Sequence, residues 1–332
     1  MPSERMFSTI RLVNGSVGDP VLYLDYPGRD NALLFDAGDN GALSMQELAD
    51  LEAVFVTHHH IDHWIGLDRI LRANLDRDKT LRLFGPAGTI HRTCARIGSY
   101  EHSFFPFQKL CIEMHELSPG CRKTATLECT KKFAEPQVVE TEWKGPVAFE
   151  TPDMTVEAVA VDHTAPCLAY AVVERKGYHP DAAKLDAGLL RPGPWVGEVL
   201  DHLRNDEPLT TKVKLQIGTF TLEELVEQGF SWSNGKRTAF VTDTQWSEGV
   251  REAIVKLASR SWRLYCDSYY ATAEAKQAAK YRHMTATAAG ELAKAAKVDE
   301  LVLMHFAPRY AGRYQMLVDE AKQVFPRVSA VF

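Results

Sequence analysis

The chain has 332 residues, of which 45% are hydrophobic and 25% charged, a composition typical of a globular protein with a large core. Its net charge of −6 excludes a general electrostatic attraction to nucleic acid, so RNA binding would require a local basic patch. The sequence contains no apolar run of the roughly 20 residues that cross a bilayer, no signal-peptide core and no Cys-x-x-Cys pair. We therefore expect a cytoplasmic protein that has reduced thiols and does not enter membranes.

The first part of the chain is predicted to consist mainly of strands. β-Branched and aromatic residues gather there in short runs separated by Gly, Asp and Asn. These strands are expected at residues 8–15, 20–26, 32–38, 53–58 and 81–89. Helices are expected at 44–51, where Ser44 and Glu47 have the spacing of a capping box, and at 64–75, where apolar residues recur at helical spacing. Residues 98–150 show no clear period, so we expect an irregular insertion there.

The second part of the chain alternates strands and helices. Strands are expected at residues 154–163, 167–174, 237–244, 262–268 and 300–306. Helices are expected at 247–258, at 286–298 and after the last strand. Residues 175–215 are rich in Gly, Pro and charged residues, which indicates an arm-like excursion from the core. The pattern predicts an α/β protein with a single domain over 1–332, in which two packed sheets carry helices on their outer faces.

Side chains of the kind that bind metals follow five of the predicted strands. They are the segment His58-His59-His60-Ile61-Asp62-His63, the pair Asp162-His163, and the single residues Asp243, Asp267 and His305. Because strand ends at one edge of a sheet lie close together, these distant residues are expected to meet, and imidazoles and carboxylates are natural ligands of Zn²⁺ and similar ions. A solvated histidine-rich loop is the less favoured alternative, since an apolar strand precedes the first segment and an amphipathic helix follows it.

The spacing within the first segment favours two metal positions. His58 and His60 are two residues apart in an extended stretch and project to the same side, whereas His59 projects away. Asp62 and His63 come where the next helix begins and point in different directions. One metal can therefore bind His58 and His60, and a second can bind Asp62 and His63. A further, less favoured zinc candidate, whose spacing fits no finger or ribbon, consists of Cys111, His115, Cys121 and Cys129.

The sequence THHHIDHW at 57–64 resembles the His-x-His-x-Asp-His motif of the metallo-β-lactamase fold, and LLFDAGDN at 33–40 resembles the strand and turn that precede this motif. Within that fold the chain is most similar to ribonuclease Z (tRNase Z), the endonuclease that trims tRNA 3′ trailers. The likeness covers most of the chain. It is strongest at 282–310, and RPGPWVGEV at 191–199 resembles the tRNA-gripping arm of that family. The resemblance implies an αββα sandwich of the metallo-β-lactamase type.

The resemblance also implies two divalent metal ions, expected to be zinc, with manganese or iron also compatible. The implied ligands are His58, His60 and His163 for the first metal, Asp62, His63 and His305 for the second, and Asp243 as the bridge. By the same resemblance, His283 and Arg309 act on the phosphate and the leaving group, and Asp36 orients ligands without binding metal. Asp62 is also expected to orient the attacking hydroxide or accept its proton, and Asp267 is a candidate for orienting His283.

The sequence departs from the family pattern at several points. Thr242 stands before Asp243 where the family usually has glycine, and Asp267 stands where it has glutamate. Residues 175–215 mix cationic and anionic side chains, which is a weak electrostatic grip for tRNA. The expected function is endonucleolytic processing of precursor tRNA by a homodimer. The alternatives are a paralogue that hydrolyses a small phosphodiester such as a cyclic nucleotide, a lactone or another ester, and a metal-bearing binding module without activity.

Overall fold

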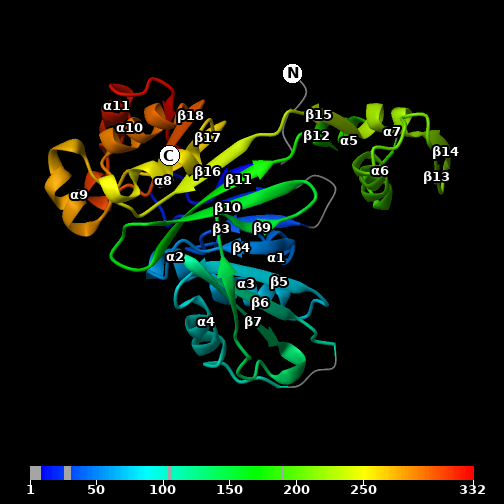
Figure 1. Ribbon diagram of the computed structural model, residues 1–332, viewed down its shortest axis with the longest axis horizontal. Helices are drawn as coiled ribbons and strands as arrows, with labels where there is room; N and C mark the ends of the chain where they lie inside the picture. The colour runs from blue at the N-terminus through cyan, green and yellow to red at the C-terminus, as the bar shows by residue number, and fades with distance from the viewer. Residues whose placement is uncertain (1–8, 26–30, 104–106, 189) are drawn as a thin grey trace.

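Two β-sheets pack face to face, and helices lie on the outer face of each sheet (Figure 1). This architecture comes from a computed structural model that describes residues 9–25, 31–103, 107–188 and 190–332. It confirms the predicted α/β class and the αββα arrangement. The outer ends of two expected strands, at residues 8 and 26, lie outside the described ranges. Within those ranges, every helix is too short or too polar to cross a bilayer.

The strands of the first sheet lie side by side in chain order. They are β1 (Thr9–Leu12), β2 (Leu22–Asp25), β3 (Ala32–Phe35), β4 (Leu51–Phe55), β5 (Thr80–Pro86), β6 (Cys111–Ser118), β7 (Gly120–Glu128) and β8 (Val139–Trp143). The helices of this half are α1 (Met45–Ala49), α2 (Ile61–Trp64), α3 (Leu67–Asn74) and α4 (Thr89–Ile97). The predicted capping box at Ser44 and Glu47 is present at the start of α1. The helix expected at 64–75 is divided, because the amide of Gly66 donates to the carbonyl of Ala37 at 2.7 Å.

The expectation of an irregular insertion at 98–150 is wrong for most of its described residues. This segment supplies β6, β7 and β8 to the first sheet and β9 (Val147–Glu150) to the second. In β6, Ile112, Met114 and Leu117 are buried, while Glu113 and Glu116 are only partly covered. β8 is mostly exposed at the edge of its sheet. Charged residues on partly exposed strands hide the apolar alternation that a buried strand shows.

The second sheet brings several strand ends to one edge. Its spatial order is β19 (Val328–Ser329), β18 (Glu300–Met304), β17 (Arg263–Asp267), β16 (Arg237–Val241), β11 (Cys167–Glu174), β10 (Met154–Val161) and β9. Its helices are α8 (Glu248–Ala258), α9 (Ala275–Tyr281), α10 (Ala286–Ala296) and α11 (Gln315–Lys322). Because β16, β17 and β18 are parallel, their carboxyl ends lie together, as do those of the parallel strands β3 and β4 in the first sheet.

Aromatic side chains fill the space between the sheets. The ring centroid of Phe55 lies 4.9 Å from those of Phe35 and Phe84, and 5.6 Å from that of Tyr170 in the opposite sheet. The Tyr170 hydroxyl donates to the carbonyl of Val56 at 2.9 Å, so the polar end of this buried ring is satisfied. Burial of each such ring stabilises the fold by about 1.5–3 kcal/mol. This layer fixes how the two sheets face each other and therefore where their strand ends meet.

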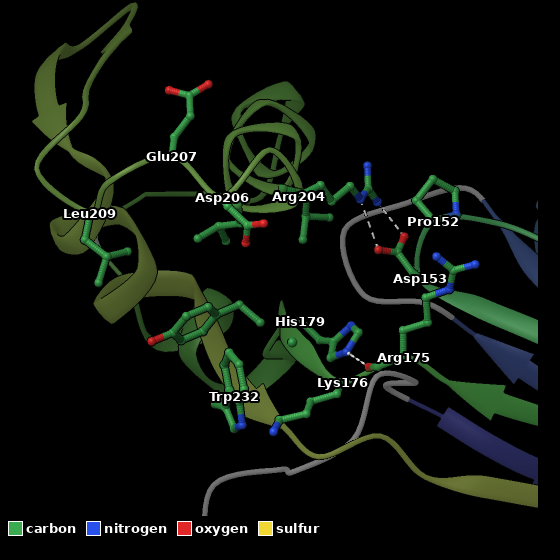
Figure 2. Close-up of a pocket in the computed structure, with 14 residues that line it drawn as sticks. Pro152, Asp153, Arg175, Lys176, His179, Arg204, Asp206, Glu207, Leu209 and Trp232 are labelled. Carbon is green, nitrogen blue, oxygen red and sulfur yellow. Dashed lines mark hydrogen bonds and ion pairs between the residues drawn. The ribbon is translucent and has the colours of Figure 1, made fainter.

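Residues 177–233 form an excursion from the second sheet with an apolar cluster of its own, which includes Trp195 and Phe230. Its elements are β12 (Gly177–Pro180), α5 (Ala182–Ala187), α6 (Pro194–Arg204), β13 (Lys212–Leu215), β14 (Gly218–Thr221), α7 (Leu222–Gly229) and β15 (Phe230–Ser233). β12 pairs with β15 at the base, and Arg204 forms an ion pair with Asp153 at 2.5 Å (Figure 2). A cavity of about 560 Å³ lies at this junction and includes Trp232 in its lining. The excursion predicted at 175–215 thus extends to residue 233.

Candidate metal centre

The polar strand ends that were expected to meet lie together at one edge of the sandwich. They are His58 and His60 after β4, Asp62 and His63 in α2, His163 after β10, Asp243 after β16 and His305 after β18. They form a first ligand group (His58, His60, His163 and Asp243) and a second ligand group (Asp62, His63 and His305). Within each group, one ligand atom from every residue lies within 4.8 Å of all the others.

The first ligand group joins the two sheets. His58 Nε2 lies 2.9 Å from His60 Nδ1, and His163 Nε2 lies 3.4 Å from the same atom. Oδ2 of Asp243 lies 3.5 Å from His58 Nε2 and 3.7 Å from His163 Nε2. His58 and His163 are buried and His60 is exposed, so solvent reaches the group on the side of His60. His59 points away, as expected, and its Nε2 lies 3.1 Å from the Thr89 hydroxyl.

The second ligand group lies next to Asp243 of the first. Asp62 Oδ2 lies 3.2 Å from His305 Nε2 and 3.6 Å from His63 Nε2. The carboxylate of Asp243 reaches both imidazoles, with Oδ2 at 3.3 Å from His63 Nε2 and Oδ1 at 2.8 Å from His305 Nδ1. Asp243 therefore lies between the two groups, the position expected of a bridging ligand.

The donor set fits divalent cations. Nε2 of His63 and Nδ1 of His305 are buried and lie beside the Asp243 carboxylate, but neither makes a hydrogen bond of normal geometry within the described ranges. Buried polar atoms without a well-formed hydrogen bond are costly, so both nitrogens suit an additional partner such as a cation. Imidazole and carboxylate ligands suit zinc, manganese and iron alike. These ligand groups are therefore able to hold divalent metal ions.

The electrostatics of the centre favour positive charge between the carboxylates. Burial disfavours the charged imidazolium of His63, but the carboxylates of Asp243 and Asp36 outweigh it and raise its pKa to about 10. Burial would raise the pKa of Asp243, but the neighbouring His305 and His63 hold it well below its usual value. At His58, burial and the nearby charge of His63 lower the pKa instead. A cation at the centre would meet the same stabilising carboxylates.

Asp36 contacts His63 of the second ligand group, a position consistent with the orienting role that the family resemblance implies. Its buried carboxylate accepts hydrogen bonds from the Thr57 amide at 2.6 Å and the Thr57 hydroxyl at 2.9 Å. His63 Nδ1 lies 2.7 Å from Asp36 Oδ2, which fixes the proton on Nδ1 and leaves Nε2 directed toward Asp243. Gly38 lets this turn approach α2 closely, because a Cβ at Gly38 would lie 2.2 Å from the Asp62 carbonyl oxygen.

His283 and Asp267 form a further group with Asp243 and His305, in which one ligand atom from each residue lies within 4.8 Å of the others, and Asp267 holds His283. His283 Nδ1 is 3.0 Å from Asp267 Oδ2, which also accepts the Met284 amide at 3.1 Å. Burial disfavours protonated His283, but the Asp267 carboxylate outweighs this effect and raises the pKa of His283. A residue that the sequence analysis missed, Tyr269, stacks on His283 with ring centroids 4.6 Å apart. Its position two residues after Asp267 at a strand end was the available signal.

Arg309 is not brought into either ligand group. Its Nη1 pairs with Glu274 Oε1 at 2.8 Å, and its guanidinium lies 5.2 Å from the Tyr270 ring centroid. The 3₁₀ turn Pro308–Tyr310 carries it past the strand end that positions His305. The less favoured cysteine site is also unsupported, because no metal-binding group within the described ranges includes Cys111, His115, Cys121 or Cys129. All of these cysteines are free thiols.

Two helix-covered sheets with a His/Asp centre at their strand ends define a metal-dependent hydrolase of the metallo-β-lactamase fold. Residues 29–228, more than half of the chain, match the beta-lactamase superfamily domain, and the chain belongs to this superfamily. It is 28% identical over 323 residues to ribonuclease Z of Deinococcus radiodurans, covering 91% of this chain and 95% of that protein. It is also 28% identical over 312 residues to ribonuclease Z of Clostridium acetobutylicum, covering 92% and 87%, respectively.

Solved structures have the same fold. The crystal structure of the short form of human tRNase Z aligns with a TM-score of 0.51 at 18% identity, covering 92% of each chain. The metallo-β-lactamase fold protein YhfI of Bacillus subtilis aligns with a TM-score of 0.56 at 14% identity, covering 96% of this chain and 93% of that one. The predicted likeness to ribonuclease Z and the predicted hydrolase class are confirmed.

Proposed function

We propose that this chain is a dinuclear metal-dependent endoribonuclease that cleaves precursor tRNA at its 3′ side. The observation that carries the proposal is the pair of adjacent ligand groups, in which the Asp243 carboxylate of the first group also lies 3.3 Å from His63 and 2.8 Å from His305 of the second. The similarity to ribonucleases Z over 91% of the chain supports RNA as the substrate class. Our proposal includes a homodimer that works in the cytoplasm, as expected from the sequence.

The proposed ligands are those of the two groups. His58, His60 and His163 would hold one divalent ion and Asp62, His63 and His305 the other, with Asp243 shared between them. Zinc is the proposed metal, and the same donors accept manganese or iron. Bound cations of this kind lower the pKa of a water molecule and offset the negative charge of a phosphodiester.

The side chains around the ligand groups have separate proposed roles in proton transfer. Asp62 is partly exposed and faces both His63 and His305, a position from which it can orient an attacking water and accept its proton. His283 would donate a proton to the departing 3′ oxygen. Its raised pKa favours the protonated form, and Asp267 fixes its ring, so His283 is suited to act as a positioned proton donor.

Arg309 remains a proposed phosphate contact, which requires its guanidinium to leave Glu274. Its guanidinium is half-exposed and pairs with Glu274, so it would have to exchange this partner for a phosphate oxygen. Guanidinium groups bind carboxylates and phosphates with the same planar pair of donors, which makes such an exchange chemically reasonable. The Tyr270 ring beneath it would keep the side chain near His283, since the ring centroids of Tyr270 and His283 are 6.0 Å apart.

The test is a comparison of three substrates with one metal-loaded preparation. Labelled precursor tRNA with a 3′ trailer, bis(p-nitrophenyl) phosphate and a cyclic nucleotide are incubated with the wild type and with Asp243→Asn. We expect cleavage of the precursor at the 3′ end of the tRNA body by the wild type and a large loss in the variant. Turnover of a small ester without cleavage of precursor tRNA would contradict the proposed substrate. Stoichiometric metal binding without turnover of any substrate would contradict the proposed activity.

A further inference from the structure

Thr242 forms a direct contact with the carboxylate that lies between the two ligand groups. It follows directly after β16, and both Thr242 and Asp243 are buried. The Thr242 hydroxyl donates a hydrogen bond to Asp243 Oδ1 at 2.7 Å. Asp243 itself has a φ of 44°, so its backbone already adopts an uncommon left-handed conformation. The side chain that precedes it thus reaches forward and contacts one specific oxygen of the carboxylate.

The two oxygens of Asp243 face different imidazoles. Oδ2 lies 3.3 Å from His63 Nε2 and 3.5 Å from His58 Nε2. Oδ1 lies 2.8 Å from His305 Nδ1 and 3.9 Å from His283 Nδ1. A rotation about the last side-chain bond of Asp243 would move both oxygens away from these positions. Because a carboxylate torsion of this kind is broad and weakly restrained by itself, its orientation depends on neighbouring groups.

We infer that Thr242 is a positioning residue, whose hydroxyl fixes the rotation of the Asp243 carboxylate so that Oδ2 faces His58 and His63 while Oδ1 faces His305. The inference rests on the proposed metal binding and not on the identity of the substrate. Hydrogen bonds of this kind to a metal ligand typically change metal affinity by about 10- to 100-fold.

A purely structural role for Thr242 is the competing explanation, because its methyl group is also buried. Substitutions of different shape separate the two explanations. Thr242→Val keeps the branched shape and removes the hydroxyl, whereas Thr242→Ser keeps the hydroxyl and removes the methyl group. If the valine variant does not fold, Thr242→Ala serves in its place, because serine and alanine differ only by the hydroxyl.

The experiment measures Zn²⁺ affinity of the metal-free protein by competition with a chromophoric chelator, with thermal unfolding of the same samples as a check on folding. We expect Thr242→Val to bind at least one Zn²⁺ about 10- to 100-fold more weakly than the wild type, and Thr242→Ser to stay within about threefold of it. Equal affinity of the valine variant and the wild type would overturn the inference. So would a serine variant as weak as the valine variant. Because no RNA enters this assay, failure of the proposed tRNA cleavage would leave its result unaffected.

Discussion

Asparagine at position 36 is expected to weaken metal binding by changing the tautomer of His63. The Asp36 carboxylate accepts hydrogen bonds from both the amide and the hydroxyl of Thr57, and His63 Nδ1 lies 2.7 Å from its Oδ2. An asparagine side chain offers one oxygen and one amino group in the same place. If its amino group faces His63, Nδ1 must accept and Nε2 carries the proton, which removes Nε2 as a metal ligand. If the amino group faces Thr57 instead, two N–H donors face each other, and the backbone N–H of Thr57 loses its acceptor.

Both outcomes carry a cost that can be estimated. An unpaired buried donor costs about 1–3 kcal/mol, and the loss of an orienting hydrogen bond typically lowers metal affinity by about 10- to 100-fold. The substitution adds no backbone strain. Asp36 has a φ of 59°, and asparagine tolerates this conformation as well as aspartate does. We therefore expect Asp36→Asn to bind at least one Zn²⁺ about 10- to 100-fold more weakly while keeping the fold.

The assay for Asp36→Asn is chelator competition combined with metal analysis of the dialysed protein and circular dichroism. Asp39→Asn is the matched control, since Asp39 is exposed and its carboxylate accepts a hydrogen bond from the nearby amide of Gly41 at 2.9 Å. The control should bind metal like the wild type. If Asp36→Asn retained both ions with wild-type affinity, Asp36 would not control the His63 tautomer and the argument would fail.

Three further outcomes test other parts of the structure. His63→Ala should lose one of two bound metal ions and most turnover while its circular dichroism stays near that of the wild type, as metal analysis would show. Phe55→Ala should lower the free energy of unfolding in urea by about 3–5 kcal/mol, because it opens a cavity between the sheets; a change below about 1 kcal/mol would contradict this. Burial, with the nearby Arg122 charge, lowers the pKa of His115 from 6.5 to about 4. The folded state therefore prefers neutral His115, and up to about 3 kcal/mol of stability should be lost as the pH falls from 6.5 to 4. The free energy of unfolding in urea, measured at pH 6.5 and at pH 4, should therefore fall less for His115→Phe than for the wild type. An unchanged pH dependence in the variant would contradict this role of His115.

The metal centre was predictable because its residues carry local signals. His58 and His60 follow an apolar strand at the spacing that puts both on one side, and His163, Asp243 and His305 each follow another strand. Parallel strands bring such ends together without any further information. The order of the strands therefore predicts which residues meet in the two ligand groups. Only the distances between their atoms had to come from the structure.

Other features could not be predicted, because their signals are weak or distant. β6 and β8 carry charged residues on partly exposed faces near a sheet edge, so their alternation does not separate buried from exposed positions. The partner of Arg309 is Glu274, which lies 35 residues earlier in the chain, and a surface ion pair leaves no periodic pattern. The contact from Thr242 to Asp243 is likewise invisible in a pattern, since it depends on the backbone conformation of Asp243.

The origin of the ligands in both halves of the chain has a consequence for biosynthesis. His58, His60, Asp62 and His63 come from the first half of the sandwich, but His305 follows β18, which is made much later. A ribosome must therefore produce nearly every core strand before all residues of both ligand groups are present. Under the proposed function, the nascent chain would be inactive until late in its synthesis. Metal binding would then stabilise two halves that are already packed together.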